Sequence, residues 1–319
     1  MTGDAARPAP AAVVVERYAF EYGDGTRALR DVSLTARAGE AVGLLGPNGC
    51  GKTTLLRAIA RAGTRPVAGI DLRAISDTPS LVLDRPVFQR SLSGRANAVA
   101  LLRMRGLSGE TAAARAARAL ARFGLEDVAD RPVSGYSRGT DHRLGLAIGF
   151  AAEASCTLLD EPLAGLDPAA RQRLATEVRG AASAGRCVIL STHDPEFART
   201  ACDRVAFMAD GRVLAVDRPS VFLDALSLET RIEIDPGAAL EDHEIGRVSD
   251  LPDGVSGPTL EETTVVYRVA DPARSLPGLL GVWLGAGLDV RMLRIREPDL
   301  RDAYFAVTGQ RLERAGELP

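Results

Sequence analysis

The sequence predicts an α/β protein: a mostly parallel sheet with an N-terminal antiparallel β part and an inserted helical subdomain, followed by a small C-terminal α+β domain. Three observations predict this fold class. Short apolar segments alternate with helical patterns, as expected of a parallel sheet covered on both faces. A charged region rich in alanine and arginine interrupts the alternation, and the composition changes after about Leu226.

The chain begins with segments that predict strands. Between Val13 and Gly46, the apolar runs VVVERYAF, ALRDVSL and EAVGLLG are separated by the turn GDG and by Ala38-Gly39. The last run leads directly into a glycine-rich loop. Residues Thr53 to Ala62 have leucine and alanine at helical spacing, so the local order is strand, glycine loop and helix.

An inserted helical subdomain is expected at about residues 92–145. It contains ETAAARAARALARF, in which Ala116, Leu120 and Phe123 share one face of a helix. After this subdomain the alternation resumes. The expected elements are a helix from Arg143 to Ala152, the buried strand CTLLD, a helix opened by Asp167-Pro168, the strand CVILS, and short strands in RVAFMAD and GRVLAVD.

The region after about Leu226 predicts a second, smaller domain. Its acidic stretch EDHEIGRVSDLPDGVSGPTLEE is rich in glycine and proline, as expected of a long surface loop. The segments TRIEID, TTVVYRV and LDVRMLRI predict strands, and helices are expected near Pro272–Gly287 and Pro298–Val307. The predicted organisation is a flexible tail at 1–12, the main domain at 13–226, the small domain at 227–309 and a tail at 310–319.

Composition restricts the class of protein. With 46% hydrophobic and 25% charged residues and a formal net charge of −3, the chain is neither a strongly basic nucleic-acid binder nor a disordered acidic chain. The longest weakly polar stretch, Ser275 to Leu288, is interrupted by Pro277 and is shorter than the about 20 residues of a membrane-spanning helix. The N-terminus lacks the basic end and apolar run of a signal peptide, so a cytoplasmic location is expected.

The clearest motif contains the only lysine of the sequence. Of 39 lysine and arginine residues, 38 are arginines, and the exception marks a place where a compact point charge is needed. Eight consecutive residues between a strand and a helix satisfy GxxxxGK[ST]: Gly46, Pro47, Asn48, Gly49, Cys50, Gly51, Lys52 and Thr53. This pattern predicts a P-loop of the NTPase type, with Lys52 on the β- and γ-phosphates, Thr53 on Mg²⁺ and Thr54 completing the contact. The alternative is a glycine-rich turn that only caps a helix.

Two carboxylates follow a second apolar strand. CTLLDEP ends in Asp160 and Glu161. Beside a P-loop, the aspartate is suited to the Mg²⁺ shell and the glutamate to polarising an attacking water. The alternative is an ordinary solvated strand end.

The order of these motifs resembles the ATP-binding cassette of ABC transporters, over roughly Val13 to Phe222. In that family an aromatic residue before the P-loop stacks on adenine, and Tyr22 lies at the matching place; Tyr18 and Phe20 are alternates that fit better as core residues. The family's signature sequence, which contacts the γ-phosphate bound by the opposite subunit, corresponds to residues 136–140, where Ser137 and Gly139 match. Without the resemblance, this segment is a loop and a helix cap.

Two further matches follow from the resemblance. Leu166-Asp167 resembles the loop that crosses the dimer interface, although an aspartate before a proline is also an ordinary helix N-cap. His193 in ILSTHD resembles the family's switch histidine, which contacts the γ-phosphate. His142 and His243 have no such context.

The sequence departs from the family at several places. The glutamine that normally binds Mg²⁺ or water has no clear match: alignment puts Asp84 there, and Gln89 comes a few residues late. Asp84 is the expected replacement, because an acid can bind Mg²⁺ with a shorter reach. Thr140 replaces the usual glutamine or methionine, and the segment before the helical subdomain is short.

The C-terminal segment GLDVRMLRIREPDLRDAYFAVTG resembles the ending of ATPase subunits from ABC-2-type exporters. Glu297-Pro298 is expected to start the last helix, with Leu300, Tyr304 and Val307 on one face. The alternative is a small appended domain without a role in transport.

The resemblance implies an ATPase that binds ATP and Mg²⁺, works as a homodimer or as a heterodimer with a related ATPase, and binds no nucleic acid. It implies polytopic membrane permease subunits on a separate chain and a cytoplasmic location, peripheral on the inner face of the cell membrane. Two alternatives remain at this point. One is a soluble ABC ATPase acting on a non-membrane complex, and the other is a nucleotide-gated regulatory or resistance module.

Overall fold

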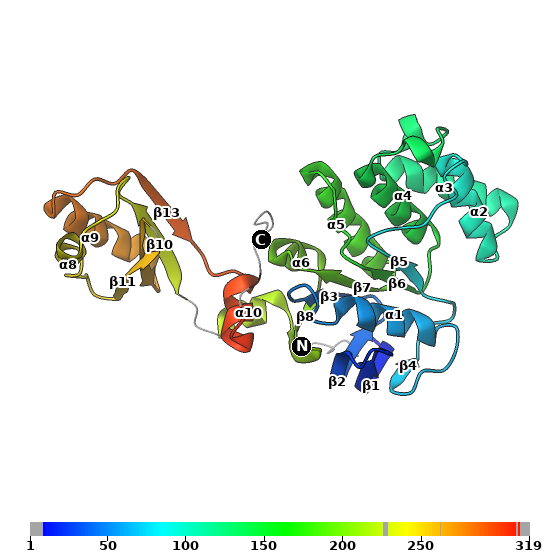
Figure 1. The fold of residues 1–319 in the computed structure, drawn as a ribbon, viewed down its shortest axis with the longest axis horizontal. Coiled ribbons are helices and arrows are strands. Elements are labelled where there is room, and N and C mark those ends of the chain that lie inside the picture. Colours follow the sequence, from blue (N-terminus) through cyan, green and yellow to red (C-terminus); the bar gives the residue numbers. More distant parts are fainter. Residues whose placement is uncertain (1–8, 226–228, 262, 311, 313–319) are drawn as a thin grey trace, which may run out of the picture. The chain divides into compact units, whose positions relative to one another are not determined.

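The computed structural model shown in Figure 1 describes residues 9–225, 229–261, 263–310 and 312. Most of the two expected tails, 1–12 and 310–319, lies outside these residues. The chain divides into two compact units, one formed by residues 1–219 with 307–319 and the other by residues 220–306. The first unit therefore ends before the predicted boundary at 226, and the described residues 307–310 and 312 also belong to it.

The first unit contains a six-stranded sheet with the order β5-β6-β7-β3-β8-β9. Its strands are β3 (Ala41–Leu45), β5 (Ser80–Val82), β6 (Cys156–Leu159), β7 (Cys187–Thr192), β8 (Arg204–Ala209) and β9 (Arg212–Asp217). Neighbouring strands are parallel except for the β8–β9 pair. Every residue of β3, β6 and β7 is buried, as expected of strands covered on both faces. The predicted, mostly parallel sheet is confirmed.

A second, antiparallel sheet forms the N-terminal part of this unit. It consists of β1 (Ala11–Glu21), β2 (Arg27–Arg37) and β4 (Ile70–Leu72), in the order β2-β1-β4. Strand β1 begins within the expected tail, because Ala11 pairs with Arg37. Helix α1 (Lys52–Ala62) follows the glycine loop, and its buried residues join side chains of both sheets in one hydrophobic core.

The helical subdomain consists of α2 (Gly94–Met104), α3 (Gly109–Arg122) and α4 (Arg138–Ala151), with short 3-10 turns at Glu126–Val128 and Val133–Gly135. Serine side chains at residues 93, 108 and 137 accept a backbone N–H at the start of each helix. Helix α4 starts at Arg138 rather than at Arg143, because the Ser137 cap begins it one turn earlier. Ala116, Leu120 and Phe123 are all buried, as their shared face predicts.

Three more helices lie at the end of the first unit and at its boundary. They are α5 (Pro168–Ser183), α6 (Pro195–Ala201) and α7 (Pro219–Ala225). Asp167 caps α5 and Asp194 caps α6, each with proline in the first turn. Helix α5 packs on β7 and α6 packs on β3, so both helices cover the central sheet.

The second unit contains a four-stranded antiparallel sheet with the order β11-β12-β10-β13. Its elements are β10 (Thr230–Asp235), α8 (Asp242–Arg247), β11 (Val255–Glu261), β12 (Thr264–Val269), α9 (Pro272–Gly285), β13 (Met292–Arg296) and α10 (Leu300–Thr308), of which the last extends into the first unit. Two expectations were wrong here. The acidic stretch is not one long loop, since it forms α8 and β11. The last helix begins at Leu300, and not at Glu297-Pro298, although Leu300 and Tyr304 are buried as expected.

Candidate nucleotide-binding site

The glycine loop joins buried strand β3 to α1, as the motif predicts. Gly49 and Gly51 have φ angles of 80° and 106°, a left-handed conformation that favours glycine. A side chain at Gly46 would place its Cβ 2.2 Å from the carbonyl oxygen of Met208, and one at Gly51 would meet Ala28 O at 2.6 Å. Glycine is therefore required at these places for conformation and for space.

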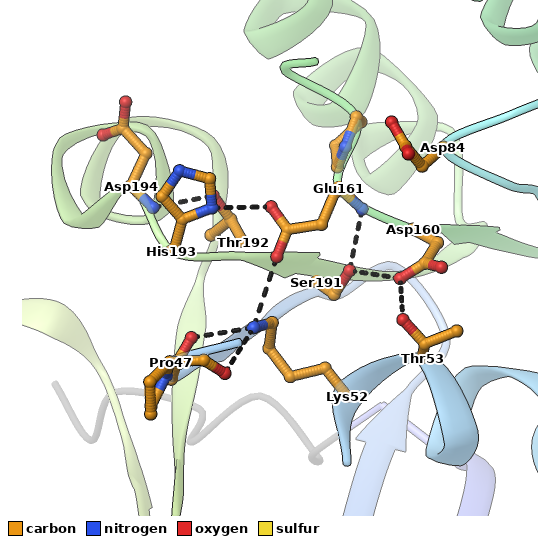
Figure 2. Close-up of polar contacts among 12 residues, drawn as sticks. Pro47, Lys52, Thr53, Asp84, Asp160, Glu161, Ser191, Thr192, His193 and Asp194 are labelled. Carbon is orange, nitrogen blue, oxygen red and sulfur yellow. Dashed lines mark hydrogen bonds and ion pairs between the residues drawn. The ribbon is translucent and has the colours of Figure 1, made fainter. Parts of the chain in front are cut away.

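Lys52 is the first residue of α1 and is only 5% exposed. Its ammonium group donates hydrogen bonds to Gly46 O at 2.7 Å and Pro47 O at 3.0 Å. It also forms an ion pair with Glu161 Oε1 at 3.2 Å, and Figure 2 shows Lys52 pointing toward Glu161. The only lysine thus brings the glycine loop and the second carboxylate together, across more than one hundred residues of sequence.

Thr53 and Asp160 also meet, as the sequence predicts. The Thr53 hydroxyl donates to Asp160 Oδ1 at 2.8 Å, and the hydroxyl of Ser191 donates to the same oxygen at 2.8 Å. Asp160 is buried at the end of β6. Sequence reasoning missed Ser191; the available signal was a polar residue near the end of the buried strand β7, two residues before His193.

Glu161 lies between Lys52 and His193 (Figure 2). His193 Nδ1 donates to Glu161 Oε2 at 3.0 Å. Burial raises the pKa of Glu161, but the hydrogen bond from His193 and the charge of Lys52 outweigh burial and hold it below its ordinary value. The hydrogen bond to Glu161 raises the pKa of His193, against the opposing effect of burial. Glu161 is therefore an ionised carboxylate at neutral pH.

These groups surround a cavity of about 640 Å³. Its walls include the predicted residues Asn48, Thr53, Asp84, Asp160, Glu161 and His193. Strand ends β6 and β7, the glycine loop and α1 thus meet at one edge of the parallel sheet, where ligands of open α/β sheets bind.

Asp84 lines the cavity, but its carboxylate faces arginines. Its oxygens form ion pairs at 3.8 Å with Arg85 and at 3.9 Å with Arg138. Gln89 does not line this cavity; its backbone N–H and carbonyl bind the side chain of Asn97. A role for Asp84 as a metal ligand stays a prediction.

His142 is buried in α4, beside this part of the site. Its Nδ1 lies 3.1 Å from Asp84 O and its Nε2 lies 3.0 Å from Pro162 O. In the sequence, His142 does not lie in a motif that would indicate a function. The structure places its ring between the segment of Asp84 and the residue that follows Glu161.

Ser137 and Gly139 lie at the start of α4. The Ser137 hydroxyl accepts the N–H of Thr140 at 3.2 Å, and the side chain is exposed. A Cβ at Gly139 would lie 2.7 Å from Gly165 O, so glycine allows the helix start to approach the loop before α5. Neither residue lines the cavity of the same chain, although Arg138 between them does.

Tyr22 is the residue directly after β1, and it lies next to the start of α1. Its hydroxyl and that of Thr54 are hydrogen-bonded at 2.9 Å, and its ring meets Phe20 edge to face at 5.0 Å. Tyr22 is 40% exposed, whereas Tyr18 and Phe20 pack against the hydrophobic core. Of the three aromatic residues considered, Tyr22 is thus the one with an accessible ring beside the glycine loop.

The glycine loop joins a strand to a helix, its threonine and two carboxylates line one cavity, and its lysine pairs with one of these carboxylates. This arrangement defines a P-loop ATPase. Residues 29–164 match the ABC transporter family. The daunorubicin resistance ATP-binding protein DrrA2 of Streptomyces coeruleorubidus is 32% identical over 315 residues, which cover 95% of this chain and 96% of that protein. The chain therefore belongs to the ABC transporter family of ATP-binding proteins.

Two further comparisons extend this assignment. The cobalt import ATP-binding protein CbiO of Rhodobacter capsulatus is 35% identical over 225 residues, covering 64% of this chain and 77% of that protein. A solved structure of the ATP-binding subunit of an ABC transporter has a TM-score of 0.60 and 26% identity, and covers 67% of this chain and 93% of that one. The chain is thus the ATP-binding and ATP-hydrolysing subunit of a transporter. Within the described residues, no helix is long and apolar enough to cross a membrane.

Proposed function

We propose that this chain powers an exporter by closing around ATP as a dimer and reopening after hydrolysis. Export is supported by the share of this chain that matches DrrA2 and the share that matches CbiO. Similarity to a drug resistance protein runs through both units, whereas similarity to an import protein covers 64% of the chain. Resistance to a drug is the expected result of its removal from the cell.

The observation that carries the catalytic proposal is that Glu161, which lines the cavity with His193, is paired with both His193 and Lys52. Lys52 binds the β- and γ-phosphates as a compact charge, because its ammonium already lies within the glycine loop. Glu161 is ionised and accepts a proton from, or orients, the attacking water. His193 contacts the γ-phosphate from the end of β7.

The donor set around Asp160 fits Mg²⁺. A hydroxyl of Thr53 and the Asp160 carboxylate lie 2.8 Å apart and are hard oxygen ligands of the kind this ion prefers. Asp84, on the same cavity, is proposed as a further ligand. When bound, Mg²⁺ neutralises charge on the phosphate oxygens.

Dimer closure is supported by the placement of Ser137 and Gly139. They lie at the N-terminus of a 14-residue helix, where backbone N–H groups and the helix dipole favour an anion. As the resemblance to the family's signature sequence implies, we assign them to the γ-phosphate of ATP bound by a second cassette, either an identical chain or a related ATPase. Leu166-Asp167 then lies at the interface, and Tyr22 stacks on adenine.

The partners of this ATPase are proposed to be polytopic permease subunits on a separate chain, which places it on the inner face of the cell membrane. The affinity-tagged chain, extracted from membranes of its source cells, is expected to copurify with a polytopic membrane protein. Recovery with a soluble complex instead, and with no membrane protein, would contradict the transport assignment.

Glu161→Gln tests the catalytic proposal. Losing the base is expected to lower the rate of ATP hydrolysis by about 10²- to 10⁴-fold while ATP binding persists. Size-exclusion chromatography with light scattering should then detect an ATP-bound dimer. Glu153→Gln, the same change on an exposed loop, is the matched control and should leave both unchanged. Normal hydrolysis by Glu161→Gln would refute the role of Glu161.

A further inference from the structure

Ser191 contacts both acidic residues of the site, Asp160 and Glu161. It lies on β7 and is fully buried. Its hydroxyl donates to Asp160 Oδ1 at 2.8 Å and accepts the backbone N–H of Glu161 at 2.8 Å. Figure 2 shows Ser191 between these two residues. One side chain thus bridges the side chain of one acidic residue and the backbone of the next.

We propose that Ser191 is a positioning residue for ATP hydrolysis, which sets the Asp160 carboxylate for Mg²⁺ and the Glu161 carboxylate for water at the same time. This inference rests on the proposed roles of Asp160 and Glu161. Ser191 does not line the cavity, so it acts through these two residues and does not touch the nucleotide.

The backbone at Glu161 needs such a contact. Its φ angle is 44°, a left-handed conformation that side-chain-bearing residues rarely adopt and that persists only where the surroundings enforce it. The Ser191 hydroxyl accepts the N–H of this residue. The turn of the backbone directs the Glu161 side chain toward Lys52 and His193, so its carboxylate lies at the cavity instead of continuing the line of β6.

Asp160 needs Ser191 once Mg²⁺ is present. Thr53 and Ser191 share Asp160 Oδ1. When the Thr53 hydroxyl turns to the metal ion, Ser191 is the remaining hydroxyl that holds the orientation of the carboxylate. Partners of this kind, one step removed from a metal ion, change metal affinity or activity by about 10- to 100-fold when they are lost.

The chain offers a matched control in Ser80. This serine is also buried, starts strand β5, which pairs with the other side of β6, and donates one hydrogen bond to Gly149 O at 3.1 Å. Ser80→Ala therefore removes a buried hydroxyl from the same sheet, but not one that contacts either carboxylate.

The experiment compares Ser191→Ala, Ser191→Thr and Ser80→Ala. For Ser191→Ala we expect kcat for ATP hydrolysis to fall by about 10- to 100-fold and KM for ATP with Mg²⁺ to rise by about 10-fold, because the Asp160 carboxylate loses its orientation while Lys52 and the glycine loop remain. Ser191→Thr restores the hydroxyl and should recover most of kcat. Ser80→Ala should keep the wild-type kcat.

A second readout does not depend on turnover. ATP binding is measured by calorimetry in the Glu161→Gln background, once with Mg²⁺ and once with a chelator. Ser191→Ala is expected to lower the affinity for ATP with Mg²⁺ by about 10-fold or more and to leave the affinity without Mg²⁺ unchanged. Equal effects of Ser191→Ala and Ser80→Ala, or wild-type kcat and Mg²⁺ dependence in Ser191→Ala, would overturn the inference. Normal hydrolysis by Glu161→Gln would instead overturn the proposed function beneath it.

Discussion

The two units bury polar side chains in different ways. In the first unit, the charged side chains of Asp160 and Glu161 line a cavity, and Lys52 forms an ion pair with Glu161, whose backbone conformation is left-handed. In the second unit, Trp283 donates its indole N–H to the Tyr267 hydroxyl at 2.9 Å, and this hydroxyl donates to Val248 O at 3.2 Å. The first cluster is charged and open to a ligand, whereas the second is neutral and closed within a hydrophobic core.

This difference suggests that the charged cluster serves ligand binding and that the neutral cluster serves the stability of the fold. A closed, neutral hydrogen-bond chain satisfies its own donors and stabilises the fold. Charged side chains beside a cavity form ion pairs with one another, and they can exchange these pairs for contacts with a charged ligand. Changes in the first cluster should therefore affect ATP binding and hydrolysis most, and changes in the second should affect unfolding alone.

The largest effect after the loss of the Glu161 base is expected from Lys52→Ala. Loss of a buried ammonium that binds phosphates should weaken ATP binding by about 10- to 100-fold, as measured by calorimetry. Arg61→Ala, an exposed cation on the same helix, should bind ATP normally. Lys52→Arg sharpens the comparison, because its planar guanidinium does not fit between Gly46 O and Pro47 O and should also weaken binding. Tight binding by Lys52→Ala would refute the phosphate role.

A smaller effect, on stability alone, is expected from Tyr267→Phe. This change leaves the indole N–H of Trp283 buried without its acceptor, at a cost of about 1–3 kcal/mol in the free energy of unfolding. Trp283 is the only tryptophan, so its fluorescence during urea unfolding reports on the second unit. ATP hydrolysis by this variant should equal that of the wild type. An unchanged unfolding midpoint would show that the closed chain does not stabilise the unit.

The smallest effect concerns pH. His193 is expected to titrate above its ordinary pKa of 6.5 in the nucleotide-free protein, and Glu161→Gln should lower this value because the carboxylate charge is lost. Nuclear magnetic resonance of the imidazole, assigned by comparison with His193→Ala, measures both values.

The sign of the stability change follows from these shifts. Since folding raises the pKa of His193, its contribution is complete below pH 6.5 and is lost as pH rises through the folded value. Folding lowers the pKa of Glu161, so its contribution is present above pH 4.5 and is lost as pH falls through the folded value. A His193 pKa at or below 6.5 would contradict the ion pair.

The sequence predicted the central sheet because its strands are short, apolar and separated by helical patterns. It predicted α4 one turn too short, because a serine cap is a single residue that also fits a loop. It predicted a long loop where α8 and β11 form, because β11 pairs with β12 and its exposed, mixed residues carry no alternating pattern of their own. Elements that depend on a partner strand are the ones that local patterns miss.

By itself the sequence determined the glycine loop, its single lysine and the two carboxylates after β6, because each is a short motif whose chemistry depends on neighbouring residues. Only the tertiary structure decided which of these groups meet. Parallel strands β6 and β7 bring Ser191 to Asp160 and Glu161, and the start of α1 brings Lys52 to Glu161. These contacts join residues 30 or more apart, and their geometry depends on how strands are ordered in the sheet, which no local motif encodes.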